Sequence, residues 1–281
     1  MGRKKGYFDQ LEAAVTRLQK RGVGEPAVAV CSSDTFRPLL SWLDEKVSIP
    51  FESIDYLPQA PSGAIPFGQF RFGLLKNTDI PVLAVEGRLP VSEGFSAAEA
   101  TYLVRLAGLL GAKTVFPIST GIGLNPAFHG GDVMLVEDHI NCTGTDPMRG
   151  LDDERAGPKV LDMTEAYHLD LLGMAEELGI ELRIKSHRGV LLSVAGPTLP
   201  TRAEYRLYRN MGADALEGSS LALETTAARA AGMRAIGLVV MVDVEHPDFL
   251  GPVTVEQIVA VENTRQAIVG RLVETFIRRI H

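Results

Sequence analysis

The sequence predicts an α/β fold in which helices flank a twisted, mixed but mostly parallel sheet. Short apolar runs rich in β-branched residues alternate along the chain with segments of helical periodicity, and such alternation favours parallel strands joined by helices. A length of 281 residues suits one large α/β domain or two small ones. No linker, internal repeat or low-complexity segment divides the chain, so residues 1–281 are expected to form a single domain.

The strands are predicted from apolar runs that end at polar or turn-forming residues. They cover residues 27–31, 81–86, 114–118, 132–137, 190–195 and 235–242, with a shorter strand at 214–216. A turn of small residues, Ser119 to Gly123, is expected to follow the strand at 114–118. Small residues there would let a ligand approach the backbone closely. The next strand is expected to run into Asp138-His-Ile-Asn141.

Start and stop signals place helices between these strands. Capping boxes, in which a serine or threonine precedes a glutamate or glutamine by three residues, open helices at Ser96, Thr201 and Thr254. Gly111 is expected to end the helix that begins at Ser96. The other predicted helices cover 7–21, 161–178 and 222–231, and the segments 57–68 and 142–160 are expected to be long loops.

Composition argues against several classes of protein. A net charge of −7 argues against a nucleic-acid partner. The chain has no run of about 18 apolar residues, so no membrane span is expected. The N-terminus lacks the apolar core of a signal peptide. Cys31 and Cys142 read as reduced thiols, and a cytoplasmic location is expected.

The candidate site lies at the carboxyl ends of the predicted strands, where open α/β sheets bind their ligands. The residues that follow the strands include hydroxyl groups, one arginine and several acids. They are Ser32 to Thr35, Gly87-Arg88, Ser119 to Gly121, Gly196 to Thr198, Glu217 to Ser220 and Asp243 to Glu245. Together they suit a ligand with an anionic part and a polar heterocycle, although a single serine or glycine in such a place is more often a turn residue.

Arg88 is the strongest single candidate for binding an anion. A guanidinium presents a planar fork that fits phosphate oxygens, and the hydroxyls of Ser33 and Ser220 are suitable partners. The alternative is a surface arginine that pairs with Glu86 or Glu93. Position along the chain does not decide between these two interpretations.

Three acids complete the candidate set. Asp243 ends a strongly apolar strand and is either a cap or a ligand-binding acid, which partial burial would let donate or share a proton. Glu245 points to the same side of an extended chain. Glu217 also ends a strand and could bind a sugar hydroxyl, although a structural ion pair is the more common role.

Other chemistries find little support in the sequence. The 6 histidines and 2 cysteines show no metal-ligand spacing, so no metal site is predicted. The chain contains neither the nucleophile elbow of serine hydrolases nor a P-loop. Gly121-Ile-Gly123 lacks the third glycine of a dinucleotide fingerprint and gives only weak support for an NAD site.

From residue 81 to residue 245 a series of motifs resembles one enzyme family, the trimeric purine nucleoside phosphorylases and the related methylthioadenosine phosphorylases. Each motif is weak by itself, but their joint order and spacing are specific. The motifs are Glu86-Gly-Arg88, Glu93-Gly-Phe95, Gly123-Leu-Asn-Pro126, Gly131-Asp-Val-Met-Leu135, Asp138-His-Ile-Asn141, Asp146-Pro-Met-Arg-Gly150, Asp162-Met163 with Ala166-Tyr167, Ala195-Gly-Pro197 and Gly212-Ala-Asp214.

The resemblance implies phosphorolysis, in which a purine nucleoside and the co-substrate inorganic phosphate give the free base and ribose 1-phosphate, without a cofactor. The enzyme would mainly orient phosphate and support the leaving base. It implies that Ser33, Arg88 and Ser220 bind phosphate. Asp243 falls on the base-recognition position, where an aspartate goes with 6-aminopurines and makes this residue the catalytic candidate.

The resemblance also implies a set of substrate-binding positions and a homotrimer. Ser119 and Thr120 stand at the family's asparagine–alanine pair, and Leu199 stands at its phenylalanine. With Glu217, Glu245 and Asp243 they complete the predicted substrate-binding set. The expected partners are a nucleoside, phosphate and further copies of the chain.

Several family positions are changed in this sequence. Proline stands at two family histidines, at about Pro66 and at Pro90, and Pro200 replaces a glutamate that reads 6-oxopurines. A sugar-contacting tyrosine is Ser92, and the aromatic residue that a neighbouring subunit contributes is absent near Val160. The first hypothesis is an active phosphorylase for 6-aminopurine nucleosides. The alternatives are an impaired homologue that binds nucleosides or bases, and a nucleoside hydrolase that uses no phosphate.

Overall fold

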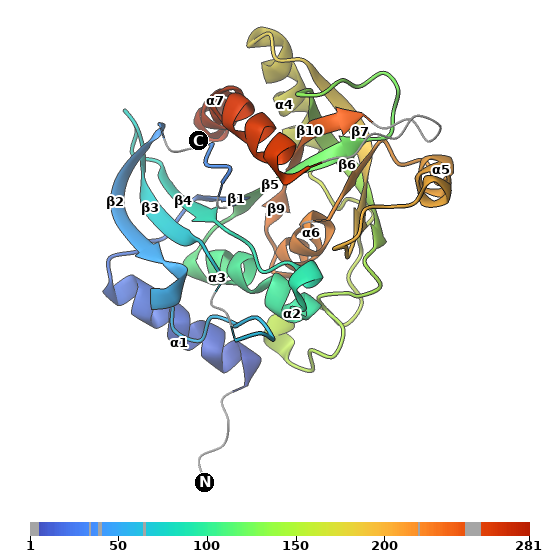
Figure 1. Cartoon of the computed structure of the whole chain (residues 1–281). Coiled ribbons are helices and arrows are strands. Elements are labelled where there is room, and N and C mark those ends of the chain that lie inside the picture. Colours follow the sequence, from blue (N-terminus) through green and yellow to red (C-terminus); the bar gives the residue numbers. More distant parts are fainter. Residues whose placement is uncertain (1–5, 34, 39–40, 64–65, 219, 245–253) are drawn as a thin grey trace.

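The structure, a computed structural model, describes residues 6–33, 35–38, 41–63, 66–218, 220–244 and 254–281 (Figure 1). The strands are β1 (Val28–Ser32), β2 (Leu43–Pro50), β3 (Gln69–Leu75), β4 (Pro81–Glu86), β5 (Thr114–Gly123), β6 (Val133–Cys142), β7 (Ser186–Val194), β8 (Ala215–Glu217), β9 (Arg234–Ala235) and β10 (Gly237–Val244). The helices are α1 (Tyr7–Lys20), α2 (Ala97–Ala100), α3 (Tyr102–Leu110), α4 (Leu169–Glu181), α5 (Arg202–Asn210), α6 (Leu221–Ala230) and α7 (Val255–Ile280). Short 3-10 helices lie at Phe51–Ser53, Val91–Glu93 and Glu154–Ala156.

The strands form one mixed sheet in the order β10-β6-β7-β8-β5-β1-β4-β3-β2, with β9 on β5. β1 runs parallel to β4 and β5, as β7 does to β6 and β8. β10 pairs with both β6 and β5, so the pairings through β5, β8, β7, β6 and β10 close into a ring. The predicted α/β class with a mixed sheet flanked by helices is therefore confirmed.

Helices cover both faces of the sheet, with α1 and α3 on one side and α7 on the other (Figure 1). The alternation along β1 shows why both faces are buried. Ala29 and Cys31 pack into the cluster that contains α1 and α3, whereas Val28 and Val30 pack into the cluster that contains α4 and α7. A strand with two buried faces reads as a continuous apolar run, which is why this strand was predictable.

The small residues after residue 118 do not form the predicted turn. Ser119 to Gly123 continue β5 and pair with β10, from Val239 opposite Ser119 to Val244 opposite Gly123. A Cβ on Gly121 would lie 2.7 Å from the carbonyl oxygen of Leu216 on β8. The glycine therefore serves close strand packing inside the ring, where a larger side chain has no room.

Two antiparallel strands, β2 and β3, were not predicted. β2 carries the charged run Asp44 to Lys46 at the edge of the sheet, and its side chains are largely exposed. Such an edge strand lacks the continuous apolar pattern by which we found the central strands. β3 holds Arg71 and Gly73 among its apolar residues, which breaks the same pattern.

The helix predicted over 161–178 begins later than expected, because α4 starts at Leu169. The Asp162 carboxylate accepts hydrogen bonds from both the backbone nitrogen and the hydroxyl of Thr164. This local turn competes with helix formation. The helix predicted from Ser96 is also interrupted, at Thr101, where α2 ends and α3 begins.

Candidate active site

Two adjoining cavities open at the carboxyl ends of the central strands. The first, which we call the polar cavity, has a volume of about 420 Å³ and is lined by Ser33, Pro66, Phe67, Arg88, Pro90, Ser92, Glu93, Ser119, Thr120, Gly218 and Glu262. The second, the apolar cavity, has a volume of about 340 Å³ and is lined by Ser92, Thr120, Gly121, Ile122, Val194, Gly196, Pro197, Thr198, Leu199, Pro200, Leu216, Glu217, Gly218, Val242 and Ile258. Ser92, Thr120 and Gly218 belong to both, so the two cavities meet there.

Arg88 lies at the end of β4 and is held by a buried ion pair. Its Nε donates to one carboxylate oxygen of Glu224 at 2.8 Å, and its Nη2 donates to the other at 3.2 Å. Nη2 also donates to the carbonyl oxygen of Ile118 at 2.8 Å. Burial lowers the pKa of Arg88, but Glu224 raises it further, so the pKa lies above its ordinary value and the side chain is cationic. The alternative prediction, that Arg88 is a surface residue paired with Glu86 or Glu93, was wrong, because its partner is the buried Glu224.

Ser33 and the neighbouring Thr35 contact a carboxylate from α7. Ser33 Oγ donates to Glu262 Oε1 at 3.0 Å, and the Thr35 hydroxyl donates to Glu262 Oε2. The backbone nitrogen of Phe36 donates to Ser33 Oγ at 3.1 Å, which fixes the serine side chain. Glu262 is only 3% exposed, yet it lines the polar cavity.

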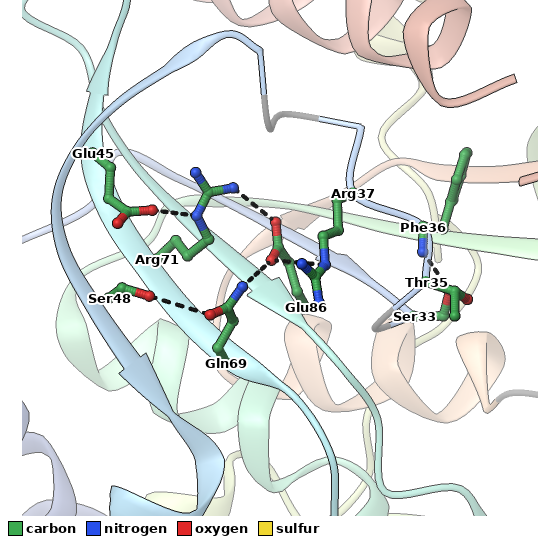
Figure 2. A network of polar contacts seen from close by, with 9 residues as sticks. All are labelled: Ser33, Thr35, Phe36, Arg37, Glu45, Ser48, Gln69, Arg71 and Glu86. Atoms are coloured by element: carbon green, nitrogen blue, oxygen red, sulfur yellow. Dashed lines mark hydrogen bonds and ion pairs between the residues drawn. The ribbon is translucent and has the colours of Figure 1, made fainter. Parts of the chain in front are cut away.

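The segment that follows β1 is anchored to the neighbouring strands, as Figure 2 shows. The buried Glu86 carboxylate on β4 accepts from Gln69 Nε2 at 2.8 Å and from Arg71 Nη1 at 3.1 Å. Arg37 Nε lies 3.5 Å from the same carboxylate. Because Arg37 follows Ser33 closely in the chain, this ion pair ties the hydroxyl-bearing segment to β4.

The close approach of α7 brings Glu262 to this segment. A Cβ on Gly270 would lie 2.1 Å from the carbonyl oxygen of Pro38, so glycine is required where the helix crosses the chain after β1. Glu262 lies earlier on the same helix, about 12 Å along the axis. Helix α7 therefore contacts the segment after β1 at two points, through Gly270 and through the Ser33–Glu262 hydrogen bond.

Ser220, the third predicted phosphate ligand, precedes α6 with a φ of 80° in the left-handed region. Its Oγ is buried and has no hydrogen-bond partner within the described parts of the chain. Neither cavity is lined by Ser220, although Gly218 lines both. Its role in phosphate binding stays a prediction, as do those of Ser33 and Arg88.

Among the described residues that line the apolar cavity, Glu217 is the charged one. Its Oε1 accepts the Ser193 hydroxyl and, at 3.2 Å, the backbone nitrogen of Leu221. The side chain is almost fully buried and is held at the end of β8 by these contacts. An ionised carboxylate in this place can accept hydrogen bonds from a ligand with N–H or O–H groups.

Ser119, Thr120 and Leu199 all reach the cavities, as the predicted substrate-binding set requires. Ser119 and Thr120 line the polar cavity, and Thr120 also lines the apolar one. Leu199 is 53% exposed at the edge of the apolar cavity. The cavity geometry is compatible with their predicted roles and does not test them.

Asp243 lines neither cavity. A β-bulge between Met241 and Asp243 shifts the alternation of β10, so that Val242 lines the apolar cavity and Asp243 is exposed. Its carboxylate accepts from the backbone nitrogen of Val244 at 2.8 Å, which matches the alternative role of a turn cap. The side chain is exposed and so lacks the partial burial that would let it donate or share a proton. Glu245 falls outside the described residues.

Sequence reasoning missed Glu262 and Glu224, the two carboxylates that engage the predicted anion ligands. A signal for Glu262 was present, because it follows Ile258 by four residues and precedes Val269 by seven, which places it on the buried face of a helix. A charged residue on such a face needs a partner or a function. Glu224 is likewise a charged residue on the buried face of a helix, α6.

Metal-binding clusters and membrane-spanning helices are both absent from the described residues. Among these residues, no group of three or more His, Cys, Asp or Glu side chains is arranged to hold a metal ion. No helix in the part of the chain that the structure describes is long and apolar enough to cross a membrane.

The chain is similar in sequence and in fold to known proteins. Residues 27–278 match the sequence profile of the phosphorylase superfamily. Purine nucleoside phosphorylase 1 of Bacillus subtilis is 32% identical over 82% of this chain and 83% of that protein. Purine nucleoside phosphorylase 1 of Geobacillus stearothermophilus is 28% identical over 96% and 97%. A Schistosoma mansoni purine nucleoside phosphorylase, solved with adenosine, superposes with a TM-score of 0.88 at 24% identity, over 96% of this chain and 97% of that one.

Proposed function

The chain belongs to the purine nucleoside phosphorylase family within the phosphorylase superfamily, and on this premise we propose that it cleaves the N-glycosidic bond of a purine nucleoside. The relatives are purine nucleoside phosphorylases, which are enzymes of the pentosyltransferase class. The observation that carries the proposal is the pair of adjoining cavities that meet at Thr120 and Gly218. A flat base suits the apolar cavity, and ribose with its acceptor suits the polar one.

The junction of the cavities suits the chemistry of this bond. As the glycosidic bond stretches, the ribose becomes oxocarbenium-like and the base accumulates negative charge, so the enzyme must orient an acceptor and support the leaving base. In the proposed pose the base lies between apolar side chains such as Ile122 and Val242. The C1′ atom then faces the polar cavity, where the acceptor lies.

We take a 6-aminopurine nucleoside as the substrate class. Glu217 supports this choice, because its carboxylate lines the apolar cavity and accepts hydrogen bonds, as an exocyclic amine requires. Pro200 lines the same cavity and has no side-chain donor or acceptor for a 6-oxo group. Asp243, from which the sequence predicted the preference, is exposed and contributes nothing to the cavity lining.

The ribosyl acceptor has two candidates. Phosphate is the acceptor that the resemblance implies, with Ser33, Arg88 and Ser220 as its ligands and ribose 1-phosphate as the product. Water is the second candidate. The specific observation that favours water is that Glu262 already accepts the Ser33 hydroxyl while Glu224 engages Arg88.

The test is the release of free base from a panel of nucleosides. Purified full-length protein is incubated with adenosine, methylthioadenosine, inosine, guanosine and cytidine, with and without inorganic phosphate. We expect base release from the 6-aminopurine nucleosides. No release from any purine nucleoside would refute the proposal. If bases still raised the melting temperature, that result would favour a binding homologue without catalysis.

We also propose that the chain acts as a homotrimer in the cytoplasm, in purine salvage. The family resemblance supports the trimer by analogy. The aromatic residue that a neighbouring subunit contributes in the family is absent near Val160, which is exposed, so this contact would differ here. Light scattering on the purified protein measures the mass of the assembly. A monomer at micromolar concentration would contradict the trimer and leave the proposed reaction standing.

A further inference from the structure

The carboxylate of Glu262 fills the anion position that the sequence predicts beside Ser33. One carboxylate oxygen accepts the Ser33 hydroxyl at 3.0 Å, and the other accepts the Thr35 hydroxyl. A bound oxyanion would use the same two hydroxyl donors. The chain thus places its own anion, carried by α7, where an anionic co-substrate would lie.

The other charges around the polar cavity also disfavour a bound anion. Glu93 and Glu262 both line the polar cavity, and Arg88 is the one cationic side chain among the described residues of that lining. The Arg88 charge is already balanced by the bidentate contact with Glu224. Phosphate carries one to two negative charges near neutral pH, so the buried Glu262 carboxylate would repel it with little screening, whereas solvent screens the repulsion from the exposed Glu93.

Glu262 differs from the structural carboxylates nearby. Glu86 and Glu224 are buried against arginines, as buried acids usually are. Glu262 is buried to a similar degree, but its hydrogen bonds come from two neutral hydroxyls, and within the described residues it forms no ion pair. A buried carboxylate that lines a cavity and has no cationic partner of its own is typical of a functional site.

We propose that Glu262 excludes phosphate from the polar cavity and acts as the general base for water, so that the chain hydrolyses its nucleoside. The proposal rests on the proposed function, since it names the acceptor in the same bond cleavage. Water bound between Glu262 and the ribose lies on the side of C1′ that faces the polar cavity. The two hydroxyls hold the carboxylate in place for this task.

The reaction balances without any further reagent. The water oxygen forms a bond to C1′, and the bond between C1′ and the base nitrogen breaks with its electron pair leaving on the base. The water proton passes to the Glu262 carboxylate, and the departing base takes a proton that solvent delivers. Carboxylic acid and solvent then exchange protons, so the products are ribose and neutral free base.

The experiment follows the product and the phosphate dependence together. With the best nucleoside of the panel, we expect base release that does not change when inorganic phosphate is added or removed. The sugar product is expected to be ribose, with one oxygen from ¹⁸O-labelled water. Release that requires phosphate and yields ribose 1-phosphate would overturn this inference while leaving the proposed function intact.

Variants separate the role of Glu262 from folding. Glu262→Gln keeps the size of the side chain and should lower kcat by about 100-fold or more, because an amide does not accept the proton. Glu256→Gln, at an exposed position of the same helix, is the matched control and should retain wild-type kcat. Melting temperatures identify a variant that has lost its fold. Full activity in a folded Glu262→Gln protein would overturn the general-base role.

Phosphate binding gives a readout that does not depend on turnover. Titration calorimetry with inorganic phosphate should detect no binding to the wild type and measurable binding to Glu262→Ala, in which both hydroxyls lose their carboxylate. Equal binding to both proteins would overturn the exclusion of phosphate. If no nucleoside is cleaved, the proposed function and the hydrolytic role fail together, and the calorimetry still decides whether Glu262 excludes phosphate.

Discussion

The two adjoining cavities differ in how their charged groups are balanced. In the polar cavity, Arg88 is paired with Glu224, and the Ser33 hydroxyl is taken by Glu262. The apolar cavity is lined mainly by aliphatic side chains and backbone, with Glu217 as its charged residue. The base half of the site therefore presents a surface ready for a ligand, whereas the chain's own side chains occupy the acceptor half. Substitutions in the polar cavity should thus affect stability, and substitutions in the apolar cavity should affect affinity.

The largest effect is expected for Arg88→Met. Removing the cation leaves the buried Glu224 carboxylate without its partner, which should lower the free energy of unfolding by about 3–5 kcal/mol. The double variant Arg88→Met with Glu224→Met should recover most of this loss, because two apolar side chains replace the pair. Urea unfolding measures both. An unchanged stability of the single variant would show that the polar cavity is not held by this pair.

Ser33→Ala should have a smaller effect on stability. The buried Glu262 carboxylate loses one of its two hydroxyl donors, and such a loss costs about 1–3 kcal/mol. Ser48→Ala is the matched control, because its exposed hydroxyl donates to Gln69 and should matter little. If the two variants unfolded at the same urea concentration, the Ser33–Glu262 hydrogen bond would not stabilise the polar cavity as we expect.

Leu199→Ala tests the apolar cavity. Loss of apolar contact with the base should raise KM about fivefold and leave kcat unchanged, because the contact is the same in the ground and transition states. Leu207→Ala on α5 is the control, since Leu207 is 54% exposed and Leu199 is 53% exposed. Steady-state kinetics on the best nucleoside measures both. A fall in kcat with KM unchanged would contradict a role in binding alone.

Asp243→Asn should have the smallest effect. The carboxylate is exposed and caps the backbone of Val244 outside both cavities, so we expect the ratio of adenosine to inosine cleavage to change by less than about twofold. Kinetics with both nucleosides tests this. A tenfold change would show that Asp243 reaches the base when a ligand is bound, as the family resemblance predicts.

Much of the fold could be predicted because the central strands carry local signals. β1 and β4 are continuous apolar runs, and the starts of α5 and α7 carry capping boxes that the structure contains. The edge strand β2 was missed because its exposed side chains leave no such pattern. The turn expected at Ser119 was wrong because this segment continues β5, where Gly121 is required by the close approach of β8 rather than by the local backbone.

The candidate site was only partly predictable for a related reason. Ser33 and Arg88 follow strands and so reach the rim of the sheet, and Ser119 and Thr120 lie in the carboxyl-terminal half of β5, so all four line the polar cavity. Glu262 comes from a helix far along the chain, and no local pattern states which strand end it will meet. The bulge in β10 that turns Asp243 outwards is likewise invisible in the alternation of its residues.

The sequence by itself determined the fold class and the family, because strand runs, capping boxes and ordered motifs depend on neighbouring residues. Tertiary structure alone decided which groups share the polar cavity. The seat of α7 on Gly270 and Pro38 brings Glu262 to Ser33, a contact between residues 229 positions apart. The net charge of the polar cavity decides whether an anionic co-substrate can bind there. That charge depends on residues far apart in the sequence, which only packing brings together.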